Sequence, residues 1–293
     1  MAAAILSIAL PGAAQQVRDT CYQCHLGLTG KLQRPSKLWA NDVHRQQGLT
    51  CTACHNGNAA IAEMAGSKGP DFIGFWERAD LPKLCGRCHA NQFAEYQASV
   101  HGRKLAAGQT EAANCTDCHA VHEIQAGAGP GSPVSPARAA QTCARCHSGA
   151  AELLNGSSHK PMLSGGEGEC LGCHGSHKTA EASAQLLTEP GPGCAQCHEA
   201  GTAGGRQAAE MARLMKDLDD ALERTDRILA QATAQGSVLS SAATDQQAGR
   251  EALQRARAAV HSFRAPEVAL QVKNGLAIME RTYRAAESAL QKK

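Results

Sequence analysis

Hydrophobic and polar positions divide this chain into two unlike parts. From Arg206 onward, apolar residues recur every three or four positions, which is typical of helices that bury one face. Gly236-Ser237 ends the first expected helix, a second runs from about Asp245 to Phe263, and Pro266 suits the first turn of a third. The first helix is expected to bury Met211, Leu214, Met215, Leu218, Leu222, Thr225 and Leu229, and the third to bury Val268, Val272, Leu276, Met279 and Tyr283.

Residues 15–200 show no such periodicity. They contain few leucines, isoleucines or valines and many glycines, and residues 127–136 and 189–193 are turn-rich connectors. Aromatic residues make up only 3% of the 293 residues. A core made of protein side chains alone would therefore be poor here. The pattern predicts a mostly α fold with extensive loops: a region of short helices over 15–200, followed by a helical hairpin or three-helix segment over 201–293.

Every cysteine of the chain belongs to one of seven C-x-x-C-H motifs, which is the attachment sequence of c-type haem. Two thioethers to the haem and an adjacent histidine on its iron require all three side chains to face one porphyrin. The cofactor-binding cysteines are Cys21, Cys24, Cys51, Cys54, Cys85, Cys88, Cys115, Cys118, Cys143, Cys146, Cys170, Cys173, Cys194 and Cys197. The proximal ligands are His25, His55, His89, His119, His147, His174 and His198.

Other uses of cysteine fit this pattern less well. A single C-x-x-C is compatible with half of a zinc site or with a redox dithiol, and fourteen cysteines are compatible with a disulfide framework. None of these uses requires a histidine directly after the second cysteine in all seven copies. The sequence therefore predicts seven haem c groups, whose porphyrins would supply the apolar mass that residues 15–200 lack.

The remaining histidines reveal a longer repeat. His101 follows His89, and His159 follows His147, by 12 residues, each in a Ser-x-His sequence. The next motif in each case is extended by a histidine three residues later, His122 and His177. Residues 85–122 and 143–177 are thus two copies of a two-haem repeat, residues 21–58 form a degenerate third copy containing His44, and the motif at 194–198 stands alone.

The chain offers fewer spare histidines than irons. Its 13 histidines, less the seven proximal ones, leave six distal candidates: His44, His101, His122, His159, His177 and His261. Ligation by two histidines keeps haem iron low-spin with a low potential, which suits electron transfer. In the repeat, the missing histidine falls at Asn58. Met64, Met162, water or a partner chain are the candidates to replace it, and simple packing is the competing interpretation of Met64.

The N-terminus and the charge indicate where the protein works. Haem c is attached outside the bacterial cytoplasm, and Ala2–Leu10 followed by small residues resembles a signal-peptide remnant over residues 1–14. Because a basic n-region is missing, a trimmed start or a disordered tail is the alternative. No further apolar stretch approaches the length of a membrane helix. The net charge of +2 argues against a nucleic-acid partner. We expect a periplasmic or extracellular protein without a transmembrane helix of its own.

With these motifs, residues 21–198 resemble the multihaem c-type cytochromes that carry S-x-H and C-x-x-C-H-x-x-H. That group includes pentahaem donors of nitrite reductase, decahaem outer-membrane conduits and octahaem hydroxylamine-oxidoreductase-like proteins. The segment His261–Ala269 is similar to the C-terminal helical part of the nitrite reductase and hydroxylamine oxidoreductase group, which implies a ligand role for His261. No C-x-x-C-K motif is present, and no pattern marks Tyr22, Tyr96 or Tyr283 as a haem crosslink, so no catalytic residue is carried over.

The leading functional hypothesis is an electron carrier with seven haems in a chain. Its expected partners are redox proteins, such as a quinol-oxidising membrane complex, a reaction centre or a terminal reductase. One alternative is an oxidoreductase that reduces a small nitrogen or sulfur oxyanion at an open haem. The other is a conducting subunit of a filament or larger complex, assembled as a homo-oligomer or with other subunits through the C-terminal helices.

Overall fold

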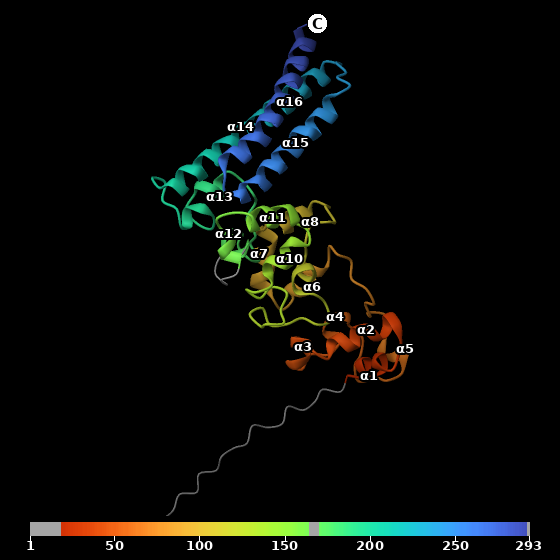
Figure 1. Cartoon of the computed structure of the whole chain (residues 1–293). Helices are drawn as coiled ribbons and strands as arrows, with labels where there is room; N and C mark the ends of the chain where they lie inside the picture. The colour runs from red at the N-terminus through yellow and green to blue at the C-terminus, as the bar shows by residue number, and fades with distance from the viewer. Residues whose placement is uncertain (1–18, 164–169, 292–293) are drawn as a thin grey trace, which may run out of the picture.

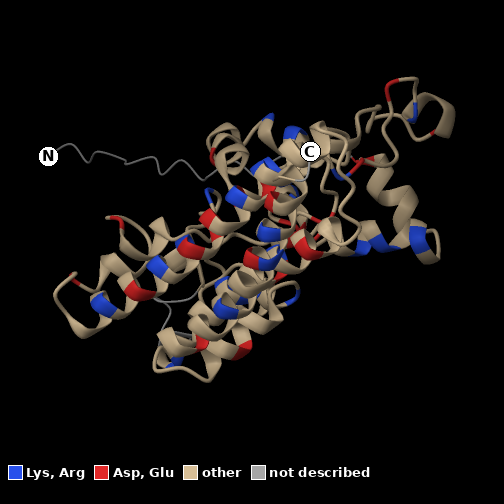
Figure 2. Cartoon of the chain, turned by 90° about the horizontal axis from the view of Figure 1, so that it is seen from above, with Lys and Arg blue, Asp and Glu red and all other residues tan. Residues whose placement is uncertain are grey.

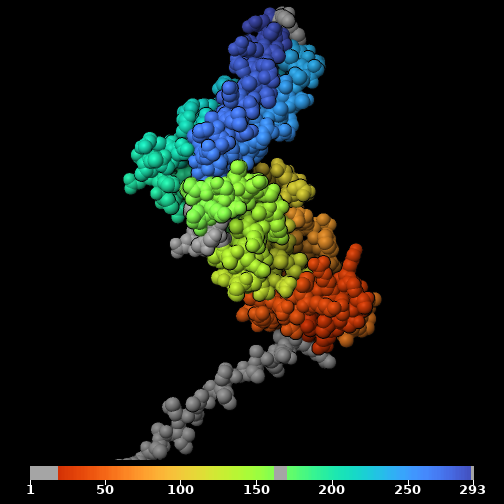
Figure 3. All heavy atoms as spheres, in the orientation of Figure 1, coloured from red at the N-terminus to blue at the C-terminus, as the bar shows by residue number. Residues whose placement is uncertain are grey.

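The computed structural model describes residues 19–163 and 170–291, so the expected signal remnant at 1–14 lies outside the described residues. Within the described ranges the chain forms sixteen α-helices and three short 3-10 helices, and no strand. The prediction of a mostly α fold with extensive loops is confirmed. The molecule is elongated, and the chain runs from the N-terminal repeat at one end, through the middle repeats, to a helical bundle at the other (Figures 1 and 3).

The three repeats consist of short helices joined by loops. The first contains α1 (Thr20–Leu26), α2 (Gly30–Trp39), α3 (Val43–Gln46) and α4 (Thr52–His55), and α5 (Met64–Ser67) follows it. The second contains α6 (Leu81–Gly86), α7 (Ala90–Ala98), α8 (Val100–Ala106) and α9 (Cys115–His119). The third contains α10 (Ala139–Ala144), α11 (Ser148–Asn155), η1 (Lys160–Leu163) and α12 (Cys170–His174). The last motif lies in η2 (Cys194–Gln196), after α13 (Gln185–Thr188).

The C-terminal part is a bundle of three long helices (Figure 1). They are α14 (Ala203–Ala234), α15 (Ala242–Ala259) and α16 (Ala265–Gln291), with η3 (Val260–Ser262) between the last two. The three predicted helices are confirmed: the first two begin three residues earlier than expected, and Pro266 lies in the first turn of α16 as predicted. Thr202 caps α14, because its side-chain oxygen accepts a hydrogen bond from the Gly205 amide at 3.1 Å.

Buried apolar side chains are concentrated in this bundle. Its core includes Met211, Met215, Leu218, Leu222, Val268, Val272 and Met279. In the described residues before 200, large buried apolar side chains are few: Trp39, Leu105 and Leu154 are scattered, and Leu187 packs against the bundle core. The expected poverty of the protein core in the repeats is confirmed.

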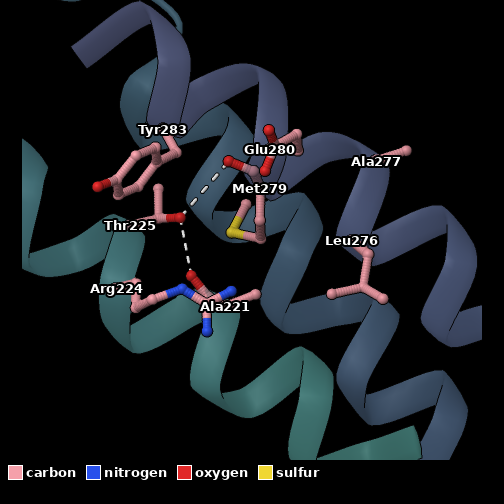
Figure 4. Close-up of a pocket in the computed structure, with 8 residues that line it drawn as sticks. All are labelled: Ala221, Arg224, Thr225, Leu276, Ala277, Met279, Glu280 and Tyr283. Atoms are coloured by element: carbon pink, nitrogen blue, oxygen red, sulfur yellow. Dashed lines mark hydrogen bonds between the residues drawn. The ribbon is translucent and has the colours of Figure 1, made fainter. Parts of the chain in front are cut away.

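Two residues of the predicted stripe on α16 are less buried than expected. Leu276 and Tyr283 are half-buried and line a groove between α14 and α16, together with Arg224 and Glu280 (Figure 4). At its floor the buried Thr225 hydroxyl donates to the Ala221 carbonyl at 2.8 Å. The groove lies within the bundle and contains no histidine or cysteine.

The surface carries charges of both signs. Lysines and arginines are interspersed with acidic residues along the helices (Figure 2). On the bundle many of them pair within one helix, as Arg213 does with Glu210 and Asp217. No helix among residues 19–163 and 170–291 combines the length and the apolar character needed to cross a bilayer.

Candidate haem-attachment sites

Each motif forms about one helical turn, which places its first cysteine and its histidine, four residues apart, on the same face of the helix. In four motifs, those of His55, His89, His147 and His198, the histidine amide donates to the carbonyl of the first cysteine four residues earlier, at 2.9–3.0 Å. None of the fourteen cysteines forms a disulfide. The motifs therefore present two thiols and an imidazole together, as haem attachment requires.

Twelve of the thirteen histidines form six ring pairs. The ring centroids within each pair are 5.9–6.1 Å apart. The pairs are His44–His89, His55–His122, His101–His147, His119–His177, His159–His198 and His174–His261. Each pair contains one histidine of a C-x-x-C-H motif and one of the six histidines that the sequence marked as distal candidates.

The separation within the pairs fits a metal ion between two imidazoles. A metal–imidazole bond of about 2 Å, plus the ~1 Å from nitrogen to ring centre on each side, places two opposed rings roughly 6 Å apart. In the described residues no group of three or more His, Cys, Asp or Glu side chains forms a metal-binding cluster. The two histidines of each pair fit a haem, whose iron they would hold between them.

Hydrogen bonds at the Nδ1 atoms orient several rings. His55 Nδ1 lies 2.7 Å from the Ile73 carbonyl oxygen, and His261 Nδ1 lies 3.1 Å from that of Ala258. His44 Nδ1 lies 2.9 Å from Asp42 Oδ1. A partner at Nδ1 fixes the tautomer that leaves the Nε2 lone pair free for a metal.

Burial favours the neutral, ligating form of several imidazoles. It lowers the pKa of His174 to about 4, with a further contribution from His261. Burial, followed by the paired histidine, likewise lowers the pKa of His101, His119, His122 and His159. These imidazoles are therefore unprotonated at neutral pH and have a free lone pair.

The pairs join neighbouring repeats in a fixed register. A histidine of the Ser-x-His type reaches forward to the first motif of the next repeat, as His101 reaches His147 and His159 reaches His198. His44, preceded by Asp42, reaches His89 in the same way. The histidine three residues after a second motif reaches backward instead: His122 and His177 face the second motifs of the preceding repeats, at His55 and His119.

The backbone repeats the same register. The amide of Val43 donates to the Ile124 carbonyl at 2.8 Å, and that of Val100 donates to Thr179 at 3.0 Å. In both cases the donor precedes a forward-reaching histidine and the acceptor lies two residues after a backward-reaching one. Asn56, Ala120 and Gly175, which follow the second-motif histidines, all have positive φ angles, of 56°, 67° and 75°. The three repeats therefore share one local geometry.

Asp42 is a functional residue that the sequence interpretation missed. Its side chain is fully buried, and Oδ1 accepts hydrogen bonds from the His44 amide at 2.8 Å and from Nδ1 at 2.9 Å. Oδ2 accepts from the Ile124 amide of the next repeat at 2.7 Å. The alignment of Asp42-Val-His44 with Ser99-Val-His101 contained the signal. A serine cannot span all three donors as a carboxylate does.

The thiols show which motifs adjoin. Hydrogen bonds between thiols link consecutive motifs: Cys115 lowers the pKa of Cys85 to about 7, and Cys170 raises that of Cys143. Burial raises the pKa of other cysteines, with smaller contributions from the thiol of an adjoining motif. These contributions come from Cys21 on Cys51, Cys85 on Cys54, Cys146 on Cys118 and Cys197 on Cys173. The seven motifs therefore adjoin in chain order.

The bundle closes over the last two pairs. The turn between α15 and α16 places His261 opposite His174, and stacks Phe263 on His159 with 3.7 Å between ring centroids. Phe263 has a left-handed φ of 55°. At the start of α14, a Cβ on Gly204 would overlap the imidazole of His198, so a side chain is not tolerated there. No pattern in the sequence marks Phe263 or Gly204 for these roles.

His25 is the histidine without a partner ring. Its Nδ1 lies 2.9 Å from the Leu32 carbonyl oxygen, but no second histidine faces it. Asn58 caps a local turn, accepting from the Ala60 amide at 2.9 Å. Met64 is 70% exposed on α5, and the side chain of Met162 lies outside the described residues.

One known family matches part of this architecture. Residues 159–203 match the family described as Doubled CXXCH motif. The chain is therefore like a multihaem c-type cytochrome. The matched range contains the sixth and seventh motifs and both His159 and His177. No curated protein and no solved structure matches the chain. Proteins with this motif bind haem c covalently, carry electrons and are typically exported.

Proposed function

We propose that the chain is a heptahaem electron carrier of the periplasm or the cell exterior, with six of its irons held between two histidines. The observation that carries the proposal is the set of six histidine pairs at 5.9–6.1 Å, each combining a motif histidine with a histidine from a neighbouring segment. Bound haem would supply the one-electron chemistry.

The protein's own residues would fix the geometry of this carrier. The cysteines hold each porphyrin, and the cross-repeat histidines lock one repeat to the next. Adjoining thiols of consecutive motifs, such as Cys85 with Cys115, support an unbroken row from Cys21 to Cys194. Two histidine ligands on an iron leave no position for substrate and favour a low potential. Such a row suits electron passage between redox partners docked near its ends.

The bundle supports this proposal better than it supports the filament alternative. Its α15–α16 turn is engaged by its own chain, through His261 and Phe263. We therefore assign to the bundle two roles: His261 completes the haem site of His174, and Phe263 covers the site of His198 by stacking on His159.

Mass spectrometry of the intact holoprotein, followed by low-temperature EPR, tests the proposal. We expect a mass increase of seven haems and low-spin signals from six of them. Fewer than seven haems, or a majority of high-spin irons, would contradict it. Protein-film voltammetry should then show reversible one-electron waves that account for all attached haems.

A further inference from the structure

His25 makes the same kind of Nδ1 contact as the proximal histidine His55. Its Nδ1 is engaged by the Leu32 carbonyl at 2.9 Å, as that of His55 is by Ile73 at 2.7 Å. Nε2 is therefore free for iron. The ring nevertheless faces no second histidine, unlike every other motif histidine.

The rest of the chain has no histidine left to offer. All twelve others are engaged in the six pairs, and residues 1–20 contain none. A second copy of the chain would bring the same engaged set. Among the described methionines, Met211, Met215 and Met279 are buried in the bundle core, and Met64 lies on the surface of α5.

The register explains why this site differs. The first motif of each later repeat is reached by a histidine from the repeat before it, as His89 is by His44. Residues 1–20 contain no motif and no histidine that could do the same for His25. The position at Asn58 is explained by the same rule: its counterparts reach backward to a preceding second motif, and residues 1–20 provide none.

We propose that the haem attached at Cys21 and Cys24 takes its sixth ligand from solution, as a small molecule that binds haem iron through one lone pair. Carbon monoxide, nitric oxide and small anions share this chemistry. His25 lies in an exposed part of the chain, because the nearby Leu26, Leu28 and Leu32 are 40%, 36% and 57% exposed. The site lies in the repeat at the N-terminal end of the molecule (Figure 3). The inference rests on the proposed haem attachment and adds a ligand-binding site to it.

Carbon monoxide titration of the dithionite-reduced holoprotein tests the inference. We expect one carbon monoxide per chain of seven haems, together with one high-spin signal in the oxidised state. The variant His44→Ala is the matched control, because it opens the site at His89 and should raise the count to two. A wild-type protein that binds none while His44→Ala binds one would overturn the inference.

Two further variants locate the site. Cys21→Ala/Cys24→Ala should lose one haem by mass and the whole of the carbon monoxide binding; binding that persists in this six-haem protein would place the open iron elsewhere. Met64→Ala should bind the same single equivalent as the wild type. If Met64→Ala binds one and the wild type binds none, Met64 is the ligand and the inference fails, even if the double-cysteine variant does not fold.

The mass count separates this inference from the proposed function. Fewer than seven haems in the wild type would refute the heptahaem carrier before any ligand is added. Seven haems without carbon monoxide binding would leave the carrier intact and refute the open site alone. An oxyanion reductase activity, if the chain has one, would reside at this same site.

Discussion

Replacing Asp42 tests how one carboxylate joins two repeats. The buried side chain accepts three hydrogen bonds, from the His44 amide, from His44 Nδ1 and from the Ile124 amide, at 2.8, 2.9 and 2.7 Å. In Asp42→Ala these donors lose their partner. A buried donor without a partner costs about 1–3 kcal/mol. Because the His44 ring is partly exposed and can bind water, we expect the free energy of unfolding to fall by about 3–5 kcal/mol, toward the lower end of the sum for three donors.

The same substitution should loosen the distal ligand of the His89 site. Loss of an outer hydrogen bond typically weakens metal binding by a histidine about 10- to 100-fold. Carbon monoxide competes with His44 for that iron, so its apparent affinity there should rise by a similar factor. A titration should therefore show one more equivalent bound per chain than in the wild type.

Asp42→Ser is the matched control. The serine of the third repeat, Ser157, accepts a hydrogen bond from the His159 amide at 3.1 Å, so a serine at 42 should keep the cap on His44. It should lose the bonds to Nδ1 and to Ile124, and fall between the wild type and Asp42→Ala in thermal stability. If the alanine and serine variants both match the wild type in melting temperature and in carbon monoxide affinity, the carboxylate does not join the repeats and the reasoning is refuted.

Three further predictions follow from single contacts. Gly204→Ala should lower the free energy of unfolding by about 1–3 kcal/mol, because the methyl group of the new alanine would overlap the His198 ring. Gly201→Ala is the control: this position has open space around it, so the melting temperature should not change. In the His44–His89 and His159–His198 pairs the ring planes make angles of 72° and 73°, which would leave the iron dπ orbitals nearly degenerate. EPR should therefore show two strongly axial low-spin signals, and His159→Ala should remove one of them. Equal rhombic signals from all six irons would contradict this. Burial alone would raise the pKa of Asp117, but the hydrogen bond from Arg78 and the nearby charges together have the larger effect, and the pKa is lowered. The ionised carboxylate therefore stabilises the fold above about pH 4, and this stabilisation is lost as the pH falls through the lowered pKa. Asp117→Asn should accordingly cost about 0.5–1 kcal/mol at pH 7 and progressively less as the pH falls below about 4, and a cost that does not change with pH would contradict the assignment.

The sequence predicted much of the architecture, because its strongest signals are local. A helical turn forms within each C-x-x-C-H motif, and the heptad-like apolar spacing after residue 206 produces α14 and α16 directly. The poor protein core of the repeats was also foreseeable from composition. The predicted burial of Leu276 and Tyr283 was too great, because the burial of a helix face depends on the angle at which the neighbouring helix packs against it.

Which histidines would face one another could not be predicted, because that depends on the register between repeats. Spacings of 12 and three residues mark His101 and His122 as candidates but do not say whether either reaches forward or backward. The register is set by long-range contacts, such as the hydrogen bond from the Val43 amide to the Ile124 carbonyl at 2.8 Å. Those contacts also conceal the role of Asp42, whose third partner lies in the next repeat.

The same register accounts for both ends of the row. At the C-terminal end, the second motif of the third repeat needs a histidine reaching backward from a later second motif, but the motif at 194–198 corresponds to a first motif, and residues 199–293 contain no further C-x-x-C-H sequence. His261 fills that position from the bundle, at 5.9 Å from His174. At the N-terminal end, the first motif needs a histidine reaching forward, and residues 1–20 contain none. In the proposed heptahaem carrier, repeats that ligate their neighbours would leave one position to be filled at each end of the row; His261 from the bundle would fill one, and the other would lie at His25.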